Sequence, residues 1–397
     1  MSRPGANHPG GFSFNSEISG APMAQTFDVA IIGGGIAGFS LAHFLAPHKN
    51  VVVLEREDAF GYHATGRSAA EFAFRFHTPL VGKLAALSFP FLTTPPDGFS
   101  QTPLLIPREM LLIAPEEKRA RLDEVFETES RSTDRLTRLT VDEALQRAPI
   151  LNPEFFSSAF HDPDCWDIEV ESLFQAYQRS ARQSGAAAHR KAGLISAQRK
   201  DGIWLLETAA GVLTVNTVVI ASGAWADETA VMLGARPLGL TPFNRTVVTV
   251  DLPVGTSWAA MPEVQEIDED FYMKPDAGKL LLSPADENDS LPCDAQPEEL
   301  GIAWAMHWVS EATILKPDRP SHAWAGLRTF APDRAPVIGW DKSAEGVFWL
   351  AGQGGFGIQT SPALGRYAAD LLRGLPLADG FKRAGVDRAD MKPARFS

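Results

Sequence analysis

The feature that most restricts the fold is a glycine-rich turn in the stretch FDVAIIGGGIAGFSLA, residues 27–42. Residues 29–32 form a short apolar run, which is typical of a strand buried on both faces. The glycines follow this run, and apolar residues then recur with helical spacing. Between a strand and a helix, Gly33 permits a tight turn, Gly35 lets the backbone approach a pyrophosphate, and Gly38 allows close packing. The stretch therefore predicts a dinucleotide site.

A second apolar run, NVVVLERE, ends in the carboxylate that such a site needs. Glu55 stands 17 residues after Gly38, close to the spacing at which an acid binds the ribose in dinucleotide-binding folds. Helical spacing is expected from Phe39 on, and the N-terminus of this helix offers free N–H groups and a partial positive charge to the phosphates. The strand, turn, helix and acid together make the prediction specific.

Composition describes an ordinary globular protein, with 45% hydrophobic and 21% charged residues. A net charge of −13 and the absence of a basic block argue against a nucleic-acid partner. The two cysteines, Cys165 and Cys293, have neither metal-ligand spacing nor a disulfide pattern, so we expect no metal and a reducing compartment. No apolar run reaches the roughly 18 residues that a transmembrane helix needs.

The first 25 residues are rich in Gly, Pro, Ser and Asn and lack the apolar segment of a signal peptide. We therefore expect residues 1–25 to be a disordered tail. Met23 stands just before the first strand and is an alternative start of translation. The expected location is the cytoplasm, either free or at the inner face of the membrane.

The chain also closes on a strand, a glycine turn and a helix, in EGVFWLAGQGGFGIQTSPALGRYAADLL at residues 345–372. We expect Ser361 to cap this helix and Pro362 to be its first residue. A further buried strand is predicted at residues 217–221, after the hairpin-like ETAAGVLT. The two glycine units lie about 300 residues apart. They can serve one cofactor only if the C-terminus completes the first lobe and the segment between them carries a second.

These stretches resemble the D-amino-acid oxidase superfamily of flavoenzymes, which includes glycine oxidase and sarcosine oxidase. The resemblance rests on IIGGGIAGFSLAHFL, VVLERE with GYHATGRSAA, VVIASGAW, and WAGLRTFAPDRAPVIG followed by LAGQGGFGIQTSPALG. Within the superfamily the chain is most similar to the bacterial FAD-dependent D-arginine dehydrogenase type. The shared stretches are GYHATGRSAA, RPLGLTP, FYMKPDAG, HAWAGLR and QGGFGIQTS.

The resemblance implies an α/β fold, a Rossmann-like FAD-binding domain with an inserted α+β substrate domain. The FAD-binding domain is expected at residues 26–95, 150–235 and 325–390, and the substrate domain at 96–149 and 236–324. Sarcosine-oxidase relatives attach FAD through a cysteine, but LRTFAPD contains none, so we expect non-covalent FAD. The implied FAD-binding residues are Gly33, Gly35, Ile36, Ala37, Gly38, Glu55, Arg56, Ser68, Ala69, Gly223, Trp225, Gly354, Gly355, Phe356, Gly357 and Ile358.

The substrate implied by the resemblance is an amino acid, whose carboxylate needs a positively charged partner. Arginine binds a carboxylate best, through two parallel hydrogen bonds. Arg328 in HAWAGLR stands where the family has its carboxylate clamp, and Arg245 and Tyr272 match other substrate-contacting positions. Neither His63 nor His77 is expected to be a general base.

Two positions depart from the D-arginine dehydrogenase pattern, because its histidine after GRSAA is Glu71 here and a nearby tyrosine is Phe76. Glu109 matches the position that holds the substrate's guanidinium in that type. Glu71 and Glu109 together favour a cationic side chain. The alternative is that Glu71 is neutralised by Arg75 on the same face of a strand, which leaves an aromatic pocket for apolar substrates.

The function implied is FAD-dependent oxidative deamination of D-amino acids. Hydride passes from Cα to flavin N5, and the imine then gives a 2-oxo acid and ammonia. The alternative is an FAD-dependent oxidase of secondary amino acids such as sarcosine, or of glycine, since both functions need the same carboxylate clamp. The electron acceptor, whether a quinone, another carrier or oxygen, stays open. The remote C-terminal glycine unit argues against an NAD-dependent dehydrogenase.

Overall fold

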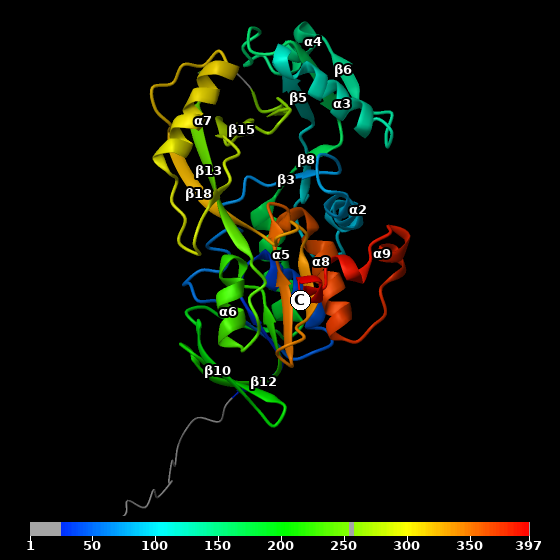
Figure 1. Cartoon of the computed structure of the whole chain (residues 1–397), viewed down its shortest axis with the longest axis vertical. Coiled ribbons are helices and arrows are strands. Elements are labelled where there is room, and N and C mark those ends of the chain that lie inside the picture. Colours follow the sequence, from blue (N-terminus) through cyan, green and yellow to red (C-terminus); the bar gives the residue numbers. More distant parts are fainter. Residues whose placement is uncertain (1–24, 254–257, 397) are drawn as a thin grey trace, which may run out of the picture.

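The computed structural model of the protein describes residues 25–253 and 258–396 (Figure 1). Two large sheets and a smaller three-stranded sheet organise the chain. The predicted mixed α/β fold is confirmed. The predicted tail falls almost entirely outside the described residues, and Gln25 already belongs to the first strand.

The first sheet contains the predicted dinucleotide-binding strands. Its order is β10–β11–β12–β1–β2–β9, and β20 pairs with the second half of β12 and with β19. Strands β1, β2, β9, β12 and β20 are parallel. The bounds are β1 Gln25–Ile32, β2 Val51–Leu54, β9 Ala187–His189, β10 Leu194–Lys200, β11 Ile203–Thr208, β12 Gly211–Ile220, β19 Val337–Trp340 and β20 Val347–Ala351.

Both faces of this sheet are covered, which is why its central strands are apolar throughout. Alternate residues of β1 enter two different cores: Val29 and Ile31 face one, and Ala30 and Ile32 face the other. The first core includes helices α1 Ile36–Leu45, α2 Pro79–Thr93, α5 Val170–Gln183 and α8 Gly357–Leu372. The second includes the short helix α6 Ala226–Met232.

The second sheet is mostly antiparallel and lies at the other end of the molecule with α7 Glu299–Ala312, α3 Arg119–Glu129 and α4 Val141–Arg147 (Figure 1). Its order is β21–β18–β13–β16–β15–β14–β5–β7–β6, with β17 beside β13. The bounds are β5 Met110–Ala114, β6 Thr137–Leu139, β7 Ser158–Asp162, β13 Thr241–Asp251, β14 Glu263–Glu266, β15 Tyr272–Asp276, β16 Lys279–Ser283, β17 Asn288–Asp289, β18 His322–Phe330 and β21 Gln353–Gly354.

The small sheet joins β3 Glu71–Ala73, β8 Cys165–Ile168 and β4 Leu105–Pro107. A short helix, α9 Asp379–Arg383, lies near the C-terminus. The predicted domain boundaries stay a prediction. Pairing of β7 with β5 places residues 158–162 in the second sheet, although we expected residues 150–235 in the FAD-binding domain.

The C-terminal glycine turn connects the two large sheets. After β20 the chain forms β21, whose Gly354 pairs with Thr329 of β18. The predicted start of the following helix is wrong, because α8 begins at Gly357 and Pro362 lies inside it. The Ser361–Pro362 pair is typical of a helix start, but Thr360 already donates a backbone hydrogen bond to Phe356. The helix therefore begins directly at the glycine turn.

No helix among the described residues is long and apolar enough to cross a membrane.

Candidate active site

One cavity of about 530 Å³ collects most of the predicted site residues. It lies where four parallel strands end, since its lining includes the last residues of β1 and β2, Ile32 and Leu54, and the first residues after β12 and β20, Ala221 and Gly352. Ligands in open α/β sheets bind at this edge. Strands β13, β15 and β18 of the second sheet close the other side.

The first glycine turn is shaped by two contacts that exclude side chains. Gly33 has a φ of +115°, and a Cβ there would lie 2.3 Å from the carbonyl oxygen of Ala221. A Cβ on Gly38 would lie 2.1 Å from the carbonyl oxygen of Gly33. A Cβ on Gly35 would meet only Thr65 Oγ1, at 3.2 Å. Gly33 and Gly38 are therefore required by the fold, whereas Gly35 leaves space on the cavity side.

The start of α1 offers backbone donors to the cavity. Gly35 and Ala37 line it, and their N–H groups have no acceptor among residues 25–253 and 258–396. The N–H of Ile36 donates to Thr65 Oγ1 at 3.0 Å. Because a helix N-terminus also carries a partial positive charge, this turn suits a phosphate group.

Glu55 is held in place by the same turn. One carboxylate oxygen accepts from the N–H of Gly34 at 2.9 Å, and the other accepts from the N–H of Glu57 at 2.9 Å. The carboxylate also lines the cavity, where its remaining lone pairs can bind ribose hydroxyls. The predicted role of Glu55 fits this geometry.

Aromatic and cationic groups line the cavity beyond Glu55. The guanidinium of Arg56 lies 4.7 Å from the ring centre of Trp225. The imidazole ring of His63 also contacts Trp225, and the centres of the two rings are 4.6 Å apart. These three residues and Gly223 line the cavity, as do the hydrophobic residues Ile195 and Met232. This end therefore offers flat apolar surface next to the Glu55 carboxylate, which suits an adenosine.

The opposite end is positively charged. Arg328 on β18 donates to the hydroxyl of Tyr272 on β15 at 3.3 Å. Arg245 on β13 lies diagonally from Arg328 on the same sheet face, since Phe243 pairs with Arg328 and Arg245 with Gly326. All three side chains belong to residues that line the cavity. The three predicted substrate-binding residues are thus brought together.

The two arginines are incompletely neutralised. Arg245 is buried and donates to Glu287 at 3.1 Å, and Glu287 also pairs with Arg334. Burial and the charge of Arg328 lower the pKa of Arg245. Arg328 has no carboxylate partner in the described part of the chain. This end of the cavity is therefore suited to an anionic group.

The C-terminal glycine turn lies against Arg328, which with Arg245 and Tyr272 forms the predicted carboxylate clamp. A Cβ on Gly355 would lie 2.9 Å from a terminal nitrogen of Arg328, so glycine is needed beside this guanidinium. Gly354, Gly355, Gly357 and Ile358 line the cavity, and α8 begins there. Its N-terminal partial charge favours negative charge at this position.

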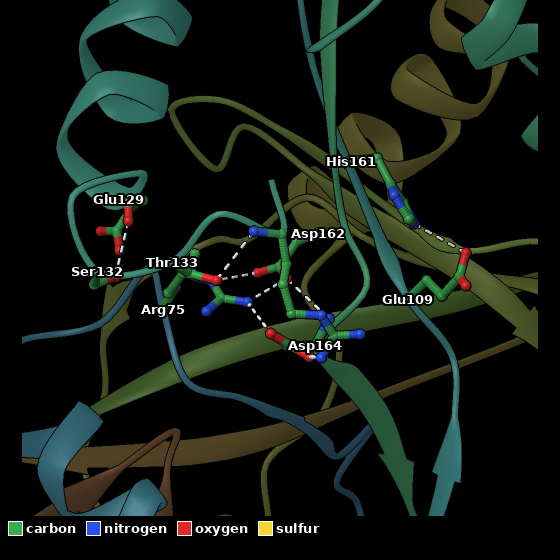
Figure 2. A network of polar contacts seen from close by, with 9 residues as sticks. Arg75, Glu109, Glu129, Ser132, Thr133, His161, Asp162 and Asp164 are labelled. Atoms are coloured by element: carbon green, nitrogen blue, oxygen red, sulfur yellow. Dashed lines mark hydrogen bonds and ion pairs between the residues drawn. The ribbon is translucent and has the colours of Figure 1, made fainter. Parts of the chain in front are cut away.

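Three predicted pocket residues, Glu71, Phe76 and Glu109, are not among the residues that line this cavity. Glu109 hydrogen-bonds His161 at 2.9 Å and lines a separate surface cavity with Arg147 (Figure 2). The ring of Phe76 packs near Phe160. Two predicted cofactor residues also lie outside the lining: Gly38 packs on Gly33, and Phe356 contacts His77.

The expected neutralisation of Glu71 by Arg75 is wrong. Arg75 forms ion pairs with Asp162 and Asp164, as Figure 2 shows. The expected strand ends at Ala73, so the alternation on which the pairing depended does not continue to Arg75. Glu71 has other neighbours, which are described below.

Several cavity residues were missed by the sequence interpretation. Thr65 fixes the start of α1, and Arg67 donates to the carbonyl oxygens of Ala295 (2.8 Å) and Ala325 (3.2 Å) and pairs with Asp294. Arg67 thereby ties three segments together at the cavity. Both residues belong to the GYHATGRSAA stretch, which was the available signal. Gly193 gave none, because it follows β9, a strand of three residues.

A comparison with known families decides what this architecture is. The family described as "FAD dependent oxidoreductase" (DAO) matches residues 28–371. The chain belongs to this family. Its members bind FAD, and the cavity fits that cofactor: donors at Gly35 and Ala37, the Glu55 carboxylate and the positive start of α8 face one space. The protein is therefore an FAD-dependent oxidoreductase.

Individual relatives refine this assignment. The glycine oxidase of Geobacillus kaustophilus is 26% identical over 88% of this chain and 94% of its own length. Rat mitochondrial dimethylglycine dehydrogenase is 25% identical over 89% of this chain, which spans only 44% of that longer protein. The crystal structure of glycine oxidase from Bacillus cereus has a TM-score of 0.76 and is 25% identical over 88% of this chain and 95% of its own. These relatives are glycine oxidases and a dimethylglycine dehydrogenase, so they do not support the predicted similarity to the D-arginine dehydrogenase type.

We expect FAD in this DAO-family protein to be bound without a covalent link. The LRTFAPD stretch that contains Arg328 has no cysteine, Cys165 is buried in another core, and Cys293 lines the cavity. Acid precipitation should therefore release the yellow colour into the supernatant, measured by flavin absorbance. Colour that stays with the precipitate in wild type but not in Cys293→Ala would instead assign a link to Cys293.

Proposed function

We propose that this protein oxidises a small or N-substituted amino acid of the glycine and sarcosine class. The observation that carries the proposal is the grouping of Arg328, Tyr272 and Arg245 at one end of the FAD cavity. The glycine oxidase relatives support the substrate class. This was the alternative interpretation of the sequence, and the relatives favour it over a D-amino acid with a cationic side chain.

The protein's own residues would bind and orient the substrate. Arg328 offers two parallel N–H groups to the carboxylate, and the Tyr272 hydroxyl donates a further hydrogen bond. Arg245 adds a second positive charge from a buried position. Such a clamp fixes the position of the carbon that is oxidised. When bound, FAD would accept a hydride, which carries the two electrons of the oxidation, and the released imine would hydrolyse in water to a 2-oxo acid and an amine.

The lining of the cavity also disfavours a cationic side chain. Among the described residues, the acidic ones that line it are Glu55 and Glu228. The Glu55 carboxylate accepts a hydrogen bond from the first glycine turn, and Glu228 lies in α6, three residues after Trp225. Both therefore lie at the dinucleotide end. At the clamp the charged lining residues are Arg245 and Arg328. Glu287 and Glu269 lie near these arginines but outside the lining, and Glu287 is already paired with Arg245 and Arg334. A guanidinium or ammonium at the clamp would therefore meet two like charges in the lining and would lose its hydration.

The test is anaerobic mixing of the purified protein with glycine, sarcosine, D-alanine, D-leucine and D-arginine, following loss of flavin colour. We expect sarcosine or glycine to reduce the flavin at least about tenfold faster than D-arginine, which corresponds to about 1.4 kcal/mol. Faster reduction by D-arginine would overturn the proposed substrate class and restore the cationic interpretation. Reduction by D-leucine above all others would favour an apolar D-amino acid.

A further inference from the structure

A cluster of charged residues lies next to the strand that carries Tyr272, and none of its members lines the cavity. It contains Glu71 of β3, Asp167 of β8, Glu263 of β14 and Lys274 of β15. Pairing of Glu71 with Asp167 and of Val264 with Met273 places these side chains across neighbouring strands, with Glu263 opposite Lys274. Glu263 and Lys274 are only 1% and 5% exposed.

Two cations contact Asp167, namely Lys274 of the cluster and Arg108 beside it. Lys274 Nζ donates to Asp167 at 2.8 Å and to the carbonyl oxygen of Ala70 at 3.4 Å. Arg108 Nε donates to Asp167 at 2.7 Å. Burial alone would lower the pKa of Lys274, but the charges of Glu263 and Asp167 together raise it. Lys274 therefore stays charged, and its hydrogen bonds go to Asp167 and Ala70.

Lys274 therefore donates no hydrogen bond to Glu71 or Glu263. One carboxylate oxygen of each is buried and accepts no hydrogen bond from a donor group in the described structure. Two carboxyl groups can satisfy one another only when one of them carries a proton and donates it to an oxygen of the other. Burial raises the pKa of Glu263 well above its usual range, and the nearby charge of Glu71 raises it further. The three carboxyl groups of Glu71, Glu263 and Asp167 and the two cations have no net charge together if one of the carboxyl groups keeps its proton.

We propose that Glu71 and Glu263 share a single proton in the folded protein, and that this pair positions the substrate clamp. Two connections transmit the effect. Ala70, which accepts from Lys274, directly follows Ser68 and Ala69 of the cavity lining. Tyr272 stands two residues before Lys274, on the same face of β15. Loss of the shared proton would add a negative charge beside Lys274 and disturb both connections.

Other titratable groups face the pair and are part of its electrostatic environment. His77 and Cys165 feel the charge of Glu71, and burial lowers the pKa of His77 and raises that of Cys165. Neither carries a charge that could replace the shared proton near neutral pH. The charged groups around the pair are Lys274, Asp167, Arg108 and, farther away, Asp162. Glu269 also feels the charge of Glu71, and burial raises its pKa although the charges of Arg245 and Arg328 oppose this.

The first test is the pH dependence of thermal stability, measured on the holoenzyme without substrate for wild type and Glu263→Gln. The folded state binds the shared proton more tightly than the unfolded chain, so wild-type stability falls as pH rises from the ordinary carboxyl range through the raised pKa. Glutamine keeps a hydrogen-bond donor and does not titrate. We expect the melting temperature of Glu263→Gln relative to wild type to rise by about 2 °C or more between pH 5 and pH 8.

The matched control is Glu266→Gln, three residues along the same buried strand. Glu266 pairs with Lys118 at 3.0 Å and accepts from the N–H of Asp268 at 2.8 Å, so its replacement should lower the melting temperature at every pH. If Glu263→Gln does not fold, Glu71→Gln tests the same proton. Infrared spectroscopy of wild type supplies an independent measurement, since a protonated buried carboxyl has its own band, which both variants should lack. A flat difference in melting temperature, or no such band at neutral pH, would overturn the proposal.

The positioning role rests on the proposed function and has its own readout. The KM for the amino acid that reduces the flavin fastest should rise at alkaline pH in wild type, by about threefold or more, and stay flat in Glu263→Gln. The kcat at saturating substrate should change little. Parallel KM profiles would leave the shared proton without a role at the clamp. The melting and infrared measurements use no substrate, so failure of the proposed function does not affect them.

Discussion

Gly35→Val yields a folded protein that no longer retains FAD. The backbone at Gly35 has a φ of −90° and a ψ of −169°, which any residue adopts. A Cβ there would meet only Thr65 Oγ1 among the described atoms, at 3.2 Å, so the chain can accept a side chain. The added methyl groups would instead occupy the cavity beside the free N–H of Ala37. We expect FAD affinity to fall at least about a hundredfold, or about 2.7 kcal/mol.

The measurement is the ratio of flavin to protein absorbance after gel filtration, with circular dichroism as the check on folding. Gly38→Val is the matched control, because its Cβ would lie 2.1 Å from the backbone oxygen of Gly33. That variant should lose both flavin and fold, whereas Gly35→Val should lose flavin alone. A yellow, stable Gly35→Val protein would contradict the predicted position of the FAD pyrophosphate at this turn.

The part of the site that the sequence predicted well is local in the chain. The turn from β1 to α1 depends on a few adjacent residues, and Glu55 follows from the end of the next strand. The start of α8 was misplaced for a local reason too, because a Ser–Pro pair is typical of a helix start, whereas Ser361 and Pro362 lie in the second turn of α8. Local signals therefore located the cofactor site and misplaced one boundary by five residues.

The pocket residues required contacts that no local signal reports. Arg75 pairs with Asp162 and Asp164, which lie in and after β7, so its partners could not be inferred from the alternation of residues 71–76. Phe76 and Glu109 both have positive φ, at 67° and 64°, which redirects their side chains. Arg328, Arg245 and Tyr272 were anticipated only through resemblance to a family, since their meeting depends on the sheet order β18–β13–β16–β15.

Arg328→Ala is expected to weaken substrate binding at least about tenfold while leaving FAD content unchanged. A charge-assisted hydrogen bond contributes about 1.5–3 kcal/mol, and Arg328 can form two to one carboxylate. Arg245 remains in the variant and keeps part of the attraction, so the loss should stop short of complete inactivity. The measurement is the substrate concentration at half-maximal rate of anaerobic flavin reduction, for the amino acid that reduces the wild-type flavin fastest.

Two graded variants separate the charge of Arg328 from its geometry. Arg328→Lys should recover only part of the affinity, because a lysine ammonium lacks the planar pair of N–H donors. Tyr272→Phe removes the hydroxyl that Arg328 contacts at 3.3 Å and should cost less than Arg328→Ala, since one neutral hydrogen bond contributes about 0.5–1.5 kcal/mol. Arg366→Ala, on the exposed side of α8, serves as the control and should match wild type. Wild-type affinity in Arg328→Ala would exclude Arg328 from the substrate site and leave Arg245 as the carboxylate partner.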